Sequence, residues 1–147
     1  MKSIFLVLAS LLLSHSARAE DMTDAAFAAM LENATLEGTW APIAGKQLGE
    51  EKSDRYEVAR AEPKGDEQWA IVWKVRYQGQ LIEYPIPAVV KFAGDAAVLF
   101  LDAVPVGDGG TWSARVLFHG DSYAGRWWNE KGKGGTVSGV IKRSSDD

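Results

Sequence analysis

The chain has 147 residues with 16 basic and 20 acidic side chains, and it contains six tryptophans, 15 glycines and no cysteine. A chain of this length forms one hydrophobic core rather than two, and that core must stabilise the fold without disulfides. The net negative charge argues against nucleic acid and anionic lipid as partners, because a surface of this sign repels phosphates.

The first residues have the layout of a secretory signal peptide. Lys2 gives a positive start, residues 4–13 form an apolar run, and Ala17-Arg18-Ala19 has the small-x-small pattern that signal peptidase reads. The apolar run is shorter than the roughly 20 residues of a membrane-spanning helix. We therefore expect no membrane span, cleavage after Ala19, and a periplasmic or extracellular protein. Cleavage would leave 14 basic and 20 acidic residues, a net charge of −6.

Residues 21–33 are predicted to form a single short helix. Thr23 or Asp24 can cap its first turn, and the apolar residues between positions 27 and 31 recur at i, i+3 and i+4, which places them on one face. Asn33 is a suitable terminator. Because the flanks are acidic, we expect this helix to pack on the body of the protein as a plug or flap rather than to bind a membrane.

After the helix the apolar residues recur with a period of two, which is typical of β-strands. Within residues 68–77 the alternation places Trp69, Trp73 and Tyr77 on one face, away from the charged residues. Pro85 and Pro87 predict a bend or a sheet edge, because proline has no N–H to donate. Turn residues separate further strands, expected at residues 36–43, 55–62, 81–84, 88–92, 96–103, 111–119, 122–129 and 136–143. This spacing predicts an all-β meander of about eight strands.

The stretch "LEGTW" (residues 36–40) follows a helical turn and opens the meander, and it resembles the start of lipocalin-like barrels. Gly38 and Trp40 match the Gly-x-Trp signature of that family, and "LEGTWAPIAGKQL" is similar to the start of small secreted bacterial lipocalin-like domains. The resemblance implies a single antiparallel up-and-down barrel of about eight strands with a short N-terminal helix. It also implies that Trp40 plugs the closed end beneath a basic residue of the last strand, here Arg143 with Lys142 beside it, through a cation–π contact.

The expected domain organisation follows from these segments. Residues 1–19 are the signal peptide, 20–35 the helix and its lead-in, 36–143 the barrel domain, and 144–147 a disordered tail. A second resemblance is to avidin-like proteins, whose tryptophan strands follow the order of "GTW", "WAIVWKVRY" and "TWSA". Ala41-Pro42-Ile43 stands where that family has polar residues that hold biotin, so we do not expect biotin binding.

Few residues could support catalysis. His119 is the single histidine after cleavage and lies beside a Gly-Asp turn, where histidine is usually solvated. The acid pairs Glu50-Glu51 and Asp66-Glu67 lie in polar, turn-like stretches, and carboxylates need burial before their pKa values suit acid–base work. Gly107-Asp108-Gly109-Gly110 lacks the alternating acids of a calcium loop. We therefore expect neither an enzyme nor a bound metal or cofactor.

The aromatic residues suggest a binding site instead. We expect the following inward side chains to line a cavity for a small apolar or amphipathic ligand: Trp40, Trp69, Trp73, Tyr77, Trp112 and Trp127. Trp128 must face the opposite way from its neighbour Trp127. It is expected either to pack under the helix or to act as an exposed anchor for a partner.

Two functional hypotheses follow. The first, which we favour, is a non-enzymatic exported protein that binds a small hydrophobic molecule inside the barrel. The second is an interaction module with a filled core, such as an inhibitor of a secreted hydrolase or a surface adhesin. Large residues at every inward position would favour the second. The small residues Ala114 and Gly125 lie beside Trp112 and Trp127 in the sequence, so both hypotheses remain open.

Overall fold

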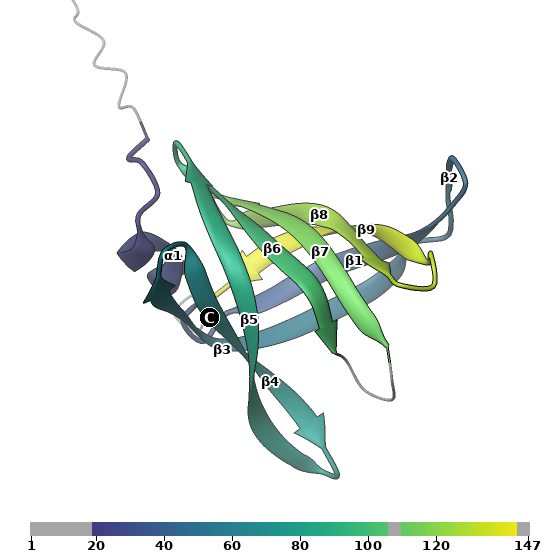
Figure 1. Ribbon diagram of the computed structural model, residues 1–147, viewed down its shortest axis with the longest axis horizontal. Coiled ribbons are helices and arrows are strands. Elements are labelled where there is room, and N and C mark those ends of the chain that lie inside the picture. Colours follow the sequence, from purple (N-terminus) through teal and green to yellow (C-terminus); the bar gives the residue numbers. More distant parts are fainter. Residues whose placement is uncertain (1–18, 106–109, 144–147) are drawn as a thin grey trace, which may run out of the picture.

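The computed structural model describes residues 19–105 and 110–143 (Figure 1). The predicted signal peptide and tail therefore lie outside the described residues, apart from Ala19. One helix precedes the strands. The elements are α1 (Asp24–Leu31), β1 (Thr35–Ala44), β2 (Gln47–Leu48), β3 (Lys52–Gly65), β4 (Gln68–Tyr77), β5 (Gln80–Ala93), β6 (Ala96–Pro105), β7 (Thr111–His119), β8 (Ser122–Asn129) and β9 (Gly134–Lys142).

The strands form a closed antiparallel barrel. Each long strand pairs with the next one along the chain, and β1 pairs with β9 from Thr35↔Lys142 to Ile43↔Gly134. The short β2 pairs only with the end of β1 and extends that strand as a hairpin. The molecule is therefore an eight-stranded up-and-down barrel with one short helix, which confirms the predicted fold class.

Helix α1 is capped by Thr23, as the sequence predicts, but it begins three residues later and ends two residues earlier than residues 21–33. The Thr23 side chain accepts a hydrogen bond from Ala26 N at 3.1 Å, which caps the first turn. The helix ends at Leu31, and Asn33 adopts a left-handed conformation with φ 48°. The Asn33 N–H then donates to the carbonyl of Ala59 at 2.9 Å. This bond ties the chain after the helix to β3 and explains why the helix ends before Asn33. With its later start, the helix has eight residues rather than the 13 expected.

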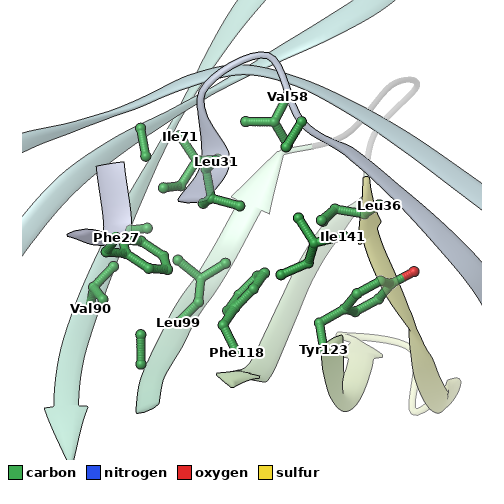
Figure 2. Close-up of a cluster of buried hydrophobic side chains, with 14 of the residues drawn as sticks. Phe27, Leu31, Leu36, Val58, Ile71, Val90, Leu99, Phe118, Tyr123 and Ile141 are labelled. Atoms are coloured by element: carbon green, nitrogen blue, oxygen red, sulfur yellow. The ribbon is translucent and has the colours of Figure 1, made fainter. Parts of the chain in front are cut away.

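Helix α1 closes one end of the barrel, here called the near end; the opposite end is the far end. Phe27 has no exposed surface, and its ring lies edge-on to Trp69, Phe92 and Phe118, with centroids 5.2, 6.1 and 5.6 Å away. Figure 2 shows Phe27 and Leu31 descending from the helix onto the inward side chains of the strands. The helix is therefore a plug in the core, as expected.

The densest part of the core lies in the near half. Buried residues there come from α1 and from every long strand of the barrel (Figure 2). The largest fully buried side chains are Phe27, Phe118, Leu31, Ile71, Val58 and Val90. Burying a side chain of this size contributes about 1.5–3 kcal/mol, so the helix and the near-half strands stabilise one another.

Glycines allow the strands of β1, β8 and β9 to approach closely. Gly38 lies directly opposite Gly139, and a Cβ added to Gly38 would come within 1.9 Å of the Ser138 carbonyl oxygen. A Cβ on Gly125 would meet the Arg115 carbonyl oxygen at 2.1 Å. No other residue fits at these positions without backbone movement. The inner wall is consequently bare of side chains at this level.

The two prolines of β5 change the sheet in a way that the sequence predicts only in part. The β4–β5 ladder runs unbroken past Pro85 and Pro87, so β5 is one strand and not the two expected. The β5–β6 ladder, however, begins only at Val89↔Phe100. Because proline cannot donate to a neighbour, residues 80–88 of β5 form a sheet edge. The expectation of an edge there is thus correct.

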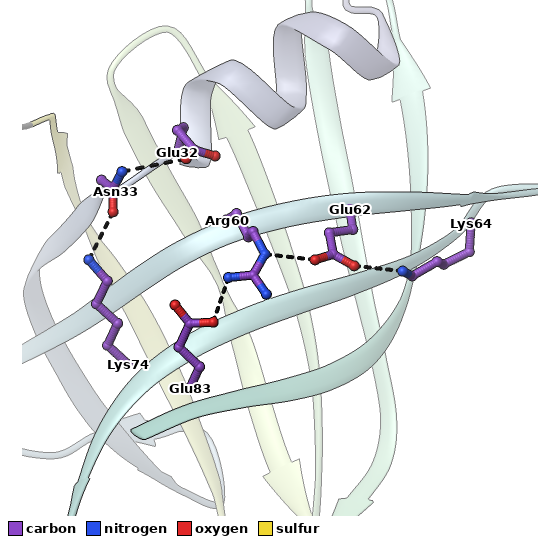
Figure 3. Close-up of polar contacts among 7 residues, drawn as sticks. All are labelled: Glu32, Asn33, Arg60, Glu62, Lys64, Lys74 and Glu83. Carbon is purple, nitrogen blue, oxygen red and sulfur yellow. Dashed lines mark hydrogen bonds and ion pairs between the residues drawn. The ribbon is translucent and has the colours of Figure 1, made fainter. Parts of the chain in front are cut away.

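Beyond the barrel, β4 and β5 continue as a hairpin that we call the arm (residues 75–82). In the arm the two strands pair only with each other, and Figure 1 shows it projecting from the far end. Two ion pairs and a hydrogen bond lie at its base on the outer face (Figure 3): Arg60 joins Glu62 at 2.7 Å and Glu83 at 2.5 Å, and Lys74 Nζ donates to Asn33 Oδ1 at 2.9 Å. Because these contacts are exposed, each contributes little to stability.

The plug makes a testable contribution to stability. Phe27→Ala should lower the free energy of unfolding by about 3–5 kcal/mol, as for other buried aromatic truncations. Ala29→Ser, on the exposed face of the same helix, should cost less than about 1 kcal/mol. Denaturant unfolding followed by circular dichroism measures both. Equal effects of the two substitutions would contradict the plug.

Candidate functional site

The first half of β3 brings polar residues into the barrel. Lys52, Asp54 and Tyr56 pair with Trp40, Gly38 and Leu36 of β1, and because residues paired across two strands share a face, all three turn inward. Within the described strands, Lys52 and Asp54 are the only charged residues on the inner face. Lys52 is exposed and Asp54 is half-buried, so the first half of β3 carries two charges on the inner face and is a candidate site.

Four inward residues form what we call the interior polar cluster: Asp54, Tyr56, Trp73 and Tyr123. Tyr56 is 37% exposed, so the cluster reaches solvent at this residue. The Tyr56 hydroxyl donates to Asp54 Oδ2, and Asp54 Oδ1 accepts from the Arg55 N–H at 2.9 Å. The Tyr56 ring meets the Trp73 ring edge-on, with centroids 5.5 Å apart. No lysine or arginine forms an ion pair with Asp54 in the part of the chain that the structure describes.

Two members of this cluster have polar atoms without a protein partner. Trp73 Nε1 and Tyr123 Oη are both buried, and neither makes a hydrogen bond to the described residues. Tyr123 is only 3% exposed. Such atoms are rare in native proteins, because each costs about 1–3 kcal/mol when left unpaired. They are therefore the feature of the interior that most needs an explanation.

The bare glycine wall separates the members of this cluster. In the sheet, Asp54 is opposite Gly38, Gly38 is opposite Gly139, and Gly139 is opposite Tyr123. No side chain stands between Asp54 and Tyr123 along this row, so both point over the same glycine surface. The arrangement places one carboxylate, two phenols and one indole N–H around a single region of the interior.

Burial and charge act together on the two phenols. Burial raises the pKa of Tyr56 well above its usual range, and the hydrogen bond to Asp54 and the charge of that residue raise it further. Burial also raises the pKa of Tyr123, and the negative charges of Asp54 and Glu37 add to the effect. Both phenols therefore stay protonated and serve as neutral hydrogen-bonding groups.

Three tryptophans gather further towards the far end in what we call the tryptophan cluster: Trp40, Trp112 and Trp127. The Trp127 ring lies 5.7 Å from Trp40 and 4.9 Å from Trp112, measured between centroids. All three are partly exposed. They provide an apolar surface next to the interior polar cluster.

The cation over Trp40 is not the one that the lipocalin-like resemblance implies. Lys52 Nζ lies 5.2 Å from the ring centroid of Trp40. Trp40 is opposite Val137, six residues before Arg143, and Arg143 instead donates to Asp121 at 2.5 Å. The implied packing of Arg143 over Trp40 is therefore wrong, because strand register places the first residue of β3, and not the end of β9, beside this ring.

The remaining predicted site residues separate into different environments. Trp73 belongs to the interior polar cluster, whereas Trp69 is 3% exposed and packs against Phe27 and Phe92 in the near-half core. Tyr77 lies in the arm and is 62% exposed. Trp69 and Tyr77 therefore do not line the site. Lys52, Asp54 and Tyr56 were missed, since charged residues at inward positions do not show the alternation of a strand.

Trp128 faces outward, as alternation predicts, but the helix does not cover it. The Arg115 guanidinium lies 5.3 Å from the centre of its ring and 4.5 Å from that of Phe100. Arg115 is held by Asp102 at 2.7 Å. The expectation that Trp128 packs under α1 is wrong; an arginine from the neighbouring strand shields it instead.

The residues considered for catalysis do not come together. His119 Nε2 lies 3.0 Å from Asp95 Oδ2 on the exposed outer face, at the end of β7. The 107–109 turn lies outside the described residues. Within the described ranges, no group of three histidine, aspartate or glutamate side chains could hold a metal ion.

A hollow of about 510 Å³ lies on the outer face of β9, β1 and β3. Among its charged groups, Glu37 pairs with Lys142 at 2.7 Å and approaches Arg55 at 4.0 Å. The hydrogen bond and charge of Lys142 lower the pKa of Glu37. Asp54 and Gly38 also line this hollow, but the two buried polar atoms without protein partners belong to inward side chains, so the barrel interior is the better candidate site.

Comparison with known proteins adds no assignment: no family model matches the chain, and neither the curated proteins nor the solved structures contain a match. Residues 19–105 and 110–143 contain no helix with the length and apolar character needed to cross a membrane.

The raised phenol pKa values predict an alkaline loss of stability. An unfolded tyrosine ionises near pH 10, whereas Tyr56 in the folded protein keeps its proton. The stability that the protonated Tyr56 phenol contributes is therefore fully present below about pH 10 and is lost as the pH rises further. Tyr56→Phe should lose less stability than the wild type between about pH 9 and pH 11, measured by denaturant unfolding. Parallel profiles of stability against pH for the two proteins would show that folding does not raise the pKa of the Tyr56 phenol.

Proposed function

We propose that the protein is an exported, non-enzymatic binding protein that holds a small amphipathic molecule inside its barrel. The single observation that carries this proposal is the pair of buried, unpartnered polar atoms, Trp73 Nε1 and Tyr123 Oη. A ligand that supplied hydrogen-bond partners to both would remove a cost of about 1–3 kcal/mol for each. Export rests on the signal-peptide pattern of residues 1–19.

The arrangement of the interior supports one orientation of the ligand. Its polar end would lie in the interior polar cluster, over the bare wall at Gly38 and Gly139. Its apolar part would extend along the tryptophan cluster towards the far end. The near half offers no such room, because Phe27 and Leu31 fill it. A barrel of eight strands can hold one small ligand of this kind.

We also propose a distant lipocalin-like relationship. Gly38 and Trp40 support it, as do the up-and-down closure of the sheet and the helix that packs against one end. The replacement of the expected Arg143 contact by Lys52 is a departure from the family pattern.

The arm favours a second candidate function, protein interaction. Tyr77 is 62% exposed and Leu81 is 53% exposed, and both lie at the tip of a projecting hairpin. Tyrosine is a typical anchor of protein interfaces, and an exposed apolar residue beside it can extend a contact surface. A secreted protein partner would bind the arm from outside, whereas the ligand would bind within the barrel, so the two functions can be separated by mutation.

A fluorescence titration with the neutral probe N-phenyl-1-naphthylamine tests the ligand proposal. The wild type should bind one equivalent saturably, and Trp127→Phe should weaken binding. Trp128→Phe is the matched control, because its side chain faces outward on the adjacent position. Replacing Tyr77 and Leu81 together by serine should leave probe binding unchanged.

Trp73→Phe extends this test to the interior polar cluster. It should lose less than about 1.5 kcal/mol of stability, the range of tolerated core substitutions, and it should weaken probe binding. Absence of saturable binding to the wild type, or an equal loss with Trp127→Phe and Trp128→Phe, would reject the ligand proposal in favour of the interaction module.

A further inference from the structure

The charge inside the barrel restricts the chemistry of the ligand that the proposed function calls for. Asp54 points inward, and its partners are a phenol hydroxyl and a backbone N–H rather than a cation. Lys52, the other inward charged residue, lies over the Trp40 ring two positions closer to the far end. The carboxylate therefore presents a negative charge to the interior, and a ligand that lies beside it must tolerate or neutralise that charge.

The groups around Asp54 match the bonding pattern of an ammonium ion. An ammonium donates three hydrogen bonds and accepts none. The Asp54 carboxylate and the hydroxyl oxygens of Tyr56 and Tyr123 are acceptors, and the oxygen of Tyr123 has no partner in the protein. The aromatic rings of Tyr56 and Trp73 add attraction for a positive charge. The Trp73 N–H can only donate, so its hydrogen-bond acceptor would be an oxygen of the ligand or a water molecule.

Other polar ends fit this arrangement less well. A carboxylate would face the like charge of Asp54 at short range, which is strongly unfavourable in a partly desolvated interior. An alcohol would form hydrogen bonds but would leave the carboxylate without a counter-charge. The net negative charge of the chain also favours a positively charged ligand during approach.

We propose that the barrel selects apolar amines, with the protonated amine held between Asp54 and Tyr123 and the apolar part against the tryptophan cluster. The inference rests on the proposed function and adds the chemical class of the ligand. It predicts that Asp54 and Lys52 have opposite effects on amine binding, because Asp54 attracts the positive charge and Lys52 repels it.

Calorimetric titration with three probes that share one apolar group tests this selectivity. The probes are 4-phenylbutylamine, 4-phenylbutan-1-ol and 4-phenylbutyrate, which at pH 7 are positive, neutral and negative. The wild type should bind the amine most tightly. Asp54→Asn should weaken amine binding about tenfold or more, the usual scale for losing a charge-assisted contact, and should change alcohol binding by less than about threefold.

Two further variants make the test specific. Lys52→Gln should strengthen amine binding and weaken 4-phenylbutyrate binding, because it removes the repelling charge. Asp66→Asn removes the same charge as Asp54→Asn from an exposed turn outside the barrel and should leave all three affinities unchanged. Circular dichroism reports whether each variant is folded, and binding of N-phenyl-1-naphthylamine reports whether the proposed binding site is intact.

The outcomes distinguish the two proposals. Tightest binding of 4-phenylbutyrate, or unchanged amine binding in a folded Asp54→Asn variant, would overturn the amine inference and leave the ligand-binding function standing. Equal losses in Asp54→Asn and Asp66→Asn would also overturn it, since the effect would then come from net charge. If none of the three compounds nor the neutral naphthylamine probe binds the wild type, the proposed function fails as well.

Discussion

The packing of one phenylalanine from the helix into the near end of the barrel determines how the rest of the interior is arranged. Phe27 lies against three aromatic rings from β4, β5 and β7, and with Leu31 it completes a dense apolar core. Because a packed core tolerates no further volume, nothing else can enter the near half. Any ligand is therefore confined to the half of the barrel that the helix leaves free.

The inner wall of that free half differs from a core in two respects. Glycines at positions 38, 125 and 139 leave it bare where the strands approach most closely. Polar groups from β3, β4 and β8 also point into it, and two of them have buried atoms without partners. A core selected for stability alone would cover the glycine wall with side chains and would give every buried polar atom a hydrogen-bond partner. Both features agree with the proposal that a ligand completes the interior.

The sequence predicted those parts of the fold that depend on local pattern. Residues 68–77 form a strand with the predicted bounds because their alternation is strict, and Trp69 and Ile71 are buried on the expected face. Thr23 caps the helix because its side chain can reach only nearby N–H groups. Alternation likewise placed Trp127 inside and Trp128 outside.

The candidate site depended on features that local pattern does not contain. Lys52 and Asp54 interrupt the apolar alternation of β3, so the first half of this strand resembled a polar connection, as is common where a function overrides the folding pattern. The cation that covers Trp40 depends on the register between β1 and β3, which no single strand reveals. Pro85 and Pro87 predicted an edge correctly, but only the unbroken β4 ladder shows that β5 continues through them.

Native mass spectrometry of the protein purified from its own cells under non-denaturing conditions tests whether the barrel holds an amine. We expect a fraction of the protein to carry the added mass of one small molecule, which is released on activation as a positively charged amine. We also expect a folded Asp54→Asn variant prepared in the same way to lack this added mass. Detection of only the bare chain in the wild type, or of the same adduct on the Asp54→Asn variant, would contradict the account.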